Sequence, residues 1–152
     1  MTTQAQTYNQ SSTPADNAPT LRYALRANAV FSLLSGLLFV LDSAQVAEFL
    51  GIRNARVFNA MSGSTFILSL GVGILAFAAV VGFLSTRHPI SKRAGTAIFV
   101  GDSVWVLASI LLIVEKALPL STGGFWAVLV VTDIVLALAI WEFIGIRRMA
   151  DS

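Results

Sequence analysis

The sequence predicts an all-α protein, a four-helix transmembrane bundle with both termini in the cytoplasm. Of its 152 residues, 56% are hydrophobic and 12% are charged, whereas a soluble domain has about 45–50% apolar and about 25% charged residues. The apolar residues gather in four long stretches, each near the about 20 residues that a helix needs to cross a bilayer. At this length we expect a single bundle and no second domain.

The chain begins with a polar segment, residues 1–20, which contains no Leu, Ile, Val or Phe and carries Pro14 and Pro19. Such a segment cannot bury enough apolar surface to offset the entropy lost on ordering, so a disordered tail is predicted. It also lacks the basic start and apolar run of a signal peptide. Thr20 is the expected N-cap of the first helix.

Four membrane spans follow from the apolar stretches. We expect them at about residues 21–41, 62–84, 94–114 and 124–146. The first span opens with Arg22 and Arg26, whose long apolar stems let their guanidinium groups reach the headgroups. Residues 44–50, closed by Gly51, are too short to cross and predict a short interfacial helix.

The later spans have clear ends. No charged residue occurs over Val57–Leu84, which makes the second span the most apolar of the four. Ser91 is the expected N-cap of the third span, and Ser121 or Thr122 of the fourth.

Basic residues predict the orientation in the membrane, because cytoplasmic flanks carry an excess of Lys and Arg. The chain ends and the loop between the second and third spans hold seven of the ten: Arg22, Arg26, Arg87, Lys92, Arg93, Arg147 and Arg148. The other two loops hold Arg53, Arg56 and Lys116. This asymmetry places both termini inside.

Small or short polar residues recur at every fourth position on two spans. They are Ala24, Asn28, Ser32 and Gly36 in the first span, and Thr65, Ser69 and Gly73 in the second. Such stripes let helix backbones approach closely. We expect both to face other helices of the same chain, with dimerisation as the alternative.

Asp102 lies well inside the third span and is the first candidate for a ligand or proton site. A charge at the centre of a membrane helix costs about 2.5–3.5 kcal/mol on insertion scales. Three arrangements could offset that cost: a protonated acid bonded to Asn28 or Ser32, an ion pair with Arg26, or a proton or cation path. By helix rise, Asn28 and Asp102 lie near one level, about 10–12 Å from the inner ends of their spans.

Two further acids and a tryptophan are candidates for the same ligand or proton site, or for its surroundings. Asp133 lies near the middle of the fourth span and is expected either to join helices or to extend a proton path. Glu142, near Arg147 and the inner surface, is expected to form a solvated salt bridge. Trp105 shares a helix face with Asp102 and either belongs to the core or walls a small apolar ligand pocket.

The residue inventory argues against catalysis. The chain has no Cys and one histidine, His88, in a loop, and no nucleophile–base set is recognisable. We therefore expect no catalytic residues, no cofactor, no metal site and no nucleic-acid partner, although an enzyme is not excluded.

Three runs carry a family resemblance: ALRANAVFSLLSGLL, LSLGVGILAFAA and GDSVWVLAS. Together they resemble a group of small, uncharacterised bacterial four-helix integral membrane proteins, and more distantly the DoxX-type proteins. The resemblance covers most of residues 21–148. It implies a multi-pass protein of the bacterial cell (inner) membrane, with an Asn-bearing first helix packed near an Asp-Trp third helix, and it supplies no substrate.

Two functions are compatible with these observations. The first is a non-enzymatic membrane protein, either an accessory subunit or a binder of a small apolar molecule. The alternative is a small proton-coupled carrier or channel component that uses Asp102 and Asp133. The expected partners are the lipid bilayer and a membrane protein or a second copy of the chain.

Overall fold

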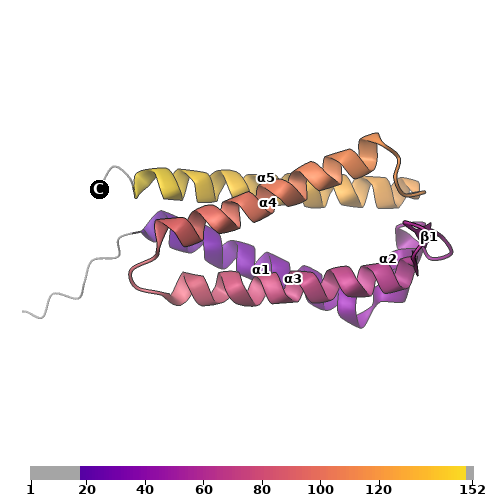
Figure 1. Ribbon diagram of the computed structural model, residues 1–152, viewed down its shortest axis with the longest axis horizontal. Coiled ribbons are helices and arrows are strands. Elements are labelled where there is room, and N and C mark those ends of the chain that lie inside the picture. Colours follow the sequence, from indigo (N-terminus) through magenta and orange to yellow (C-terminus); the bar gives the residue numbers. More distant parts are fainter. Residues whose placement is uncertain (1–17, 150–152) are drawn as a thin grey trace, which may run out of the picture.

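The computed structural model of the protein describes residues 18–149 and contains four long helices packed side by side (Figure 1). The elements are α1 (Pro19–Leu41), α2 (Ser43–Phe49), β1 (Arg56–Val57), β2 (Met61–Ser62), α3 (Gly63–Thr86), α4 (Lys92–Val114) and α5 (Thr122–Arg148). The predicted all-α architecture of four long apolar helices is thus confirmed.

The four long helices have the length and composition of membrane spans. They contain 23, 24, 23 and 27 residues, with mean hydropathies between 1.8 and 2.5. At 1.5 Å per residue each is at least about 34 Å long, which exceeds the about 30 Å of a hydrocarbon core. Most of their large apolar side chains point away from the rest of the chain, as expected where lipid replaces water.

Glycines set the closest helix contacts. At Gly36 of α1, a Cβ atom would lie 2.9 Å from the Leu75 side chain, and at Gly71 of α3 it would lie 2.7 Å from Phe39. Helix α1 therefore packs closely along α3, and it also packs along α5. At Gly145 of α5, a Cβ atom would lie 2.7 Å from the Cα atom of Leu21.

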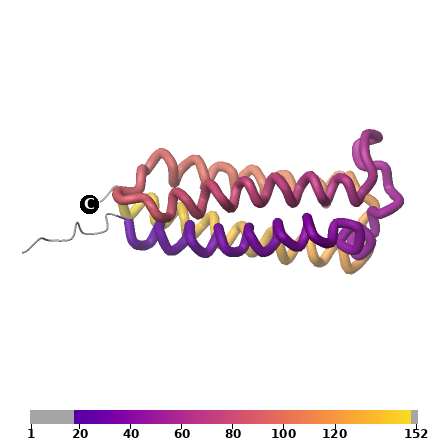
Figure 2. The backbone as a smooth tube through the Cα atoms, turned by 90° about the horizontal axis from the view of Figure 1, so that it is seen from below, coloured from indigo at the N-terminus to yellow at the C-terminus, as the bar shows by residue number. Residues whose placement is uncertain are grey.

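The start of α1 and the end of α5 lie at the same end of the bundle (Figures 1 and 2). There the Arg148 guanidinium donates to the Thr20 hydroxyl at 3.2 Å. We call this the terminal end. The side of the membrane that it faces stays a prediction.

The other end, which we call the capped end, is covered by α2 and the β1–β2 hairpin. Figure 2 shows these segments at the tips of the long helices. The Ser121 backbone N–H donates to the Leu50 carbonyl at 2.9 Å, and the Ser121 hydroxyl donates to the Phe49 carbonyl at 2.6 Å. Gly51 ends the α2 segment with a φ of 83°, a conformation that glycine adopts at little cost. These contacts attach α2 to the start of α5.

Helix α4 diverges from α3 toward the capped end (Figure 1). It packs along α5, whereas its contacts with α1 and α3 are few among the described residues. At the terminal end α4 comes close to α1, where a Cβ atom at Gly95 would lie 2.8 Å from Leu21. The bundle is therefore tight at one end and wider at the other.

Several local expectations need correction. The N-cap position of α1 is Ala18 and not Thr20, and Pro19 occupies the first turn, where its missing N–H costs nothing. Ser91 holds the N-cap position of α4 without a side-chain bond, and Ser121 caps α5 by accepting from the Gly124 N–H. The predicted tail lies mostly outside the described residues.

The two small-residue stripes have different positions. The stripe of α1 is buried, as expected. In the stripe of α3, Thr65, Ser69 and Gly73 are exposed, and nothing lies within 4 Å of a Cβ atom placed at Gly73. The expectation that this second stripe faces a neighbouring helix is wrong, because Gly71 makes the close contact with α1 instead.

Candidate functional site

Three helices bring one amide and two carboxyl groups into contact inside the bundle. The Asn28 Nδ2 of α1 donates to the Asp102 Oδ2 of α4 at 2.5 Å and to the Glu142 Oε1 of α5 at 2.8 Å. Both carboxyl oxygens thus lie within about 5 Å of each other. We call Asn28, Asp102 and Glu142 the polar triad.

The triad is shielded from the surroundings of the protein. The exposed fractions are 2% for Asn28, 4% for Asp102 and 0% for Glu142. Between residues 18 and 149, no basic side chain forms a salt bridge with either acid. Among the described residues, the hydrogen bonds to the two carboxyl groups therefore come from the neutral Asn28 amide.

Ser32, one turn further along α1, fixes the orientation of the amide. Its hydroxyl donates to the Asn28 Oδ1 at 3.1 Å, which leaves the Asn28 N–H₂ group for the acids. Since the amide has two donors and one strong acceptor site in use, every polar atom of the Asn28 side chain is bonded.

Glu142 has one oxygen without such a bond. Its Oε2 is the single buried side-chain nitrogen or oxygen atom of the described residues that finds no hydrogen-bond partner. A buried polar atom left unpaired is costly, so this oxygen marks the least satisfied position of the bundle.

Of the partners expected for Asp102 from the sequence, the structure places one beside it and another away from it. Asn28 binds it as expected, but Arg26 lies on the exposed face of α1 and forms no salt bridge with Asp102. Glu142 was expected to pair with Arg147 in solvent and is fully buried instead. Its depth, about 9 Å from the end of α5, places it at the approximate level of Asn28, but whether it points inward depends on the rotation of α5.

Arg22 holds a second polar site that sequence reasoning missed. It is buried at the terminal end, and its guanidinium donates to the carbonyl oxygens of Ser85 at 2.5 Å and Arg87 at 2.9 Å. It also donates to the His88 Nδ1 at 3.0 Å. Arg22 therefore connects α1 to the end of α3 and to the loop that follows it.

Asp133 does not join the triad. It is exposed on α5, whereas Asp102 is buried between helices. On a membrane span this surface faces lipid or another protein, so the two acids do not form one polar site within the chain.

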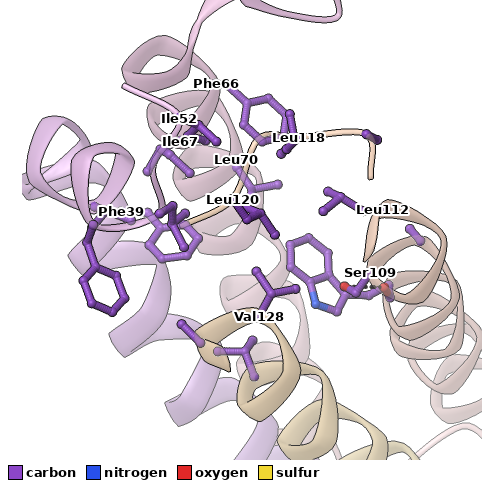
Figure 3. Close-up of a pocket in the computed structure, with 18 of the residues that line it drawn as sticks. Phe39, Ile52, Phe66, Ile67, Leu70, Ser109, Leu112, Leu118, Leu120 and Val128 are labelled. Atoms are coloured by element: carbon purple, nitrogen blue, oxygen red, sulfur yellow. Dashed lines mark hydrogen bonds between the residues drawn. The ribbon is translucent and has the colours of Figure 1, made fainter. Parts of the chain in front are cut away.

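A large apolar cavity lies toward the capped end, where α4 diverges from α3. Its volume is about 880 Å³, within the range of about 300–1,000 Å³ typical of ligand pockets. Figure 3 shows side chains from all four long helices, and from the loops that follow α2 and α4, around this space, including Phe39, Leu70, Ser109, Leu118 and Val128. Trp105 also lines it.

Two polar groups in the cavity wall belong to α4. The Ser109 hydroxyl donates to the Trp105 carbonyl at 2.9 Å, so its own lone pairs stay open. The indole N–H of Trp105 has no acceptor within the part of the chain that the structure describes. Asp42, Gln45 and Glu115 add polar groups near the capped end.

The geometry defines a class of protein. Four helices long and apolar enough to span a membrane, packed around a buried polar triad and an apolar cavity, make a small multi-pass integral membrane protein. Comparison with family profiles, with curated proteins and with solved structures finds no match. The resemblance to a bacterial four-helix family thus extends to the architecture and gains no further support. Residues 18–149 contain no group of three or more His, Asp or Glu side chains arranged to hold a metal ion.

Proposed function

We propose that the protein is a non-enzymatic membrane protein that binds a small apolar molecule in the cavity beside Trp105. The observation that carries this proposal is the cavity itself, whose wall is almost entirely apolar. An apolar molecule that enters this cavity gains van der Waals contacts with the side chains of the wall, and these contacts favour binding. The bacterial cell membrane as its location rests on the resemblance of the sequence alone.

The wall also suggests what the ligand carries. Trp105 is half-buried in the cavity wall, and its indole N–H can donate to an acceptor on a ligand. A ligand with an apolar body and a carbonyl or ether oxygen would supply that acceptor. Binding of this kind suits either a ligand-binding protein or an accessory subunit that presents the ligand to a partner.

The alternative function is a proton-coupled carrier or channel component that uses Asp102 and Asp133. Such a path requires the two acids to face one route through the bundle. Because Asp133 is exposed on α5 and Asp102 is buried, we favour binding in the apolar cavity.

Tryptophan fluorescence can test the proposal. In a Trp126→Phe, Trp141→Phe background, Trp105 is the remaining tryptophan, and the two replaced residues lie on the exposed surface of α5. Titration of the purified protein in detergent with a dibrominated long-chain methyl ester should quench Trp105 with a saturable curve. Ala108→Phe, which adds a ring to the cavity wall, should weaken the saturable quenching at least about tenfold, or about 1.4 kcal/mol.

The matched control is Ala137→Phe, which places the same ring on the exposed face of α5, outside the cavity. It should leave the titration unchanged. Quenching that rises linearly without saturation, or that Ala108→Phe does not alter, would show simple partition into detergent and would exclude the cavity as a binding site.

A further inference from the structure

Within the part of the chain that the structure describes, no cationic side chain pairs with the two acids of the polar triad. Asp102 and Glu142 accept from the same Asn28 nitrogen, at 2.5 Å and 2.8 Å. Two carboxylates so close together in a medium of low dielectric repel each other strongly, which makes ionisation of both unfavourable.

The charged groups around the pair do not relieve this repulsion. Helix α1 presents Asn28 and Ser32, which are neutral, and α3 carries no charged residue along its length. The buried Arg22 of α1 is bonded to Ser85, Arg87 and His88 at the terminal end. Neither α4 nor α5 forms a salt bridge with either acid among the described residues.

The unbonded oxygen indicates where a ligand would sit. Glu142 is fully buried and its Oε2 has no partner, while its Oε1 and the Asp102 Oδ2 each accept from Asn28. A buried carboxylate with an unbonded oxygen is unfavourable because it is charged, whereas a protonated carboxyl group carries no net charge.

A metal ion fits the triad less well than a proton. The Asn28 N–H₂ group, the positive end of the amide dipole, points at both acids, and the Asn28 Oδ1 is already used by Ser32. A metal cation between the carboxylates would therefore meet N–H donors rather than oxygen ligands.

We propose that the polar triad is a proton-binding site within the membrane spans, in which Glu142 carries one proton and Asp102 is the ionised partner held by Asn28. The bound proton removes the repulsion between the two carboxyl groups that would otherwise separate α4 from α5. The site is distinct from the apolar cavity and does not depend on the proposed function.

Infrared spectroscopy tests this site directly, because a protonated carboxyl group has a C=O stretching band that a carboxylate lacks. The measurement uses the full chain in lipid with Asp133→Asn as the background, since an exposed acid on a membrane span can hold a proton of its own. The remaining acids outside the triad lie outside the four long helices. At pH 7, where a carboxyl group in water is ionised, we expect the band of one protonated acid.

Two substitutions then assign the proton. Glu142→Gln keeps the side-chain shape and should abolish the band, whereas Asp102→Asn should retain it at full amplitude. Absence of the band in the background protein, or its survival in Glu142→Gln, would overturn the proposal. If Glu142→Gln does not fold, the Asp102→Asn protein provides the test. Loss of half or more of the C=O band in that protein would contradict Glu142 as the residue that carries the proton.

A salt comparison separates the proton from a metal cation. Replacement of choline chloride by sodium chloride at equal ionic strength should leave the band unchanged. A band that disappears in sodium would show that a metal cation displaces the proton, and would overturn the proton as the ligand.

Discussion

Single polar side chains decide how this bundle is fastened, and two arginines on one helix show the contrast. Arg22 and Arg26 are one turn apart on α1 and both precede the apolar core of the span. Arg22 is 4% exposed and bonds to two carbonyl oxygens and to His88, whereas Arg26 is exposed. The sequence could not distinguish them, because both can extend toward the headgroups.

We expect Arg22→Gln to lower the free energy of unfolding by about 1.5–3 kcal/mol, the range for a hydrogen bond to a charged group. The shorter amide cannot serve both the Ser85 and the Arg87 carbonyl oxygens. Arg26→Gln is the control and should change stability by less than about 0.5 kcal/mol. Thermal and denaturant unfolding of both variants in one detergent would measure the difference, and equal effects would contradict the structural role of Arg22.

At the scale of helices, close packing depends on which glycines face a neighbour. The four-residue spacing of small residues was sufficient to orient α1, whose stripe is buried. It failed for α3, because small residues occur on more than one face: Gly71 is buried while Gly73 is exposed. Composition alone cannot select between two faces of a helix that is apolar all round.

Gly145 and Gly73 supply a matched pair of tests. A Cβ atom at Gly145 would lie 2.7 Å from the Leu21 Cα atom and 2.8 Å from its nitrogen, whereas nothing lies within 4 Å at Gly73. Gly145→Ala should therefore push α5 from α1 and destabilise the protein by about 1–3 kcal/mol. Gly73→Ala should be neutral or stabilising by up to about 1 kcal/mol. A destabilising Gly73→Ala measured by thermal unfolding would show that the exposed stripe of α3 is covered by a partner.

For the molecule as a whole, the four long apolar helices could be predicted, because long apolar stretches are a direct consequence of bilayer thickness. The close approach of Asn28 to Asp102 also followed from counting residues along each helix. The burial of Glu142 and the exposure of Asp133 could not be predicted in this way, since both depend on the rotation of α5 about its axis. The apolar cavity could not be predicted either, because it arises from the divergence of α4 from α3.

The orientation in the membrane is the remaining expectation for the whole chain. With seven basic residues on the terminal side against three on the capped side, a reporter fused after Ser152 should be cytoplasmic. A reporter inserted at Ser121, at the capped end, should lie outside the cell. The contact between Thr20 and Arg148 requires the start of α1 and the end of α5 on one side of the membrane, so an external signal from the Ser152 fusion would reverse the whole orientation.

Helix α4 contacts α1 closely near the terminal end and diverges from α3 toward the capped end, so a small rotation about its start would move its far end the most. The Asn28–Asp102 hydrogen bond and the close contact at Gly95 fix this part of α4, and we take Asp102 as the pivot. Val114 lies about 18 Å from Asp102 along the helix axis. A rotation of about 10° about that pivot would carry the far tip through about 3 Å over this length. Such a rotation would widen or narrow the space beside Trp105 without moving the triad, so ligands of rather different size should fit, and discrimination between them should come from the oxygen that accepts from the indole N–H rather than from size.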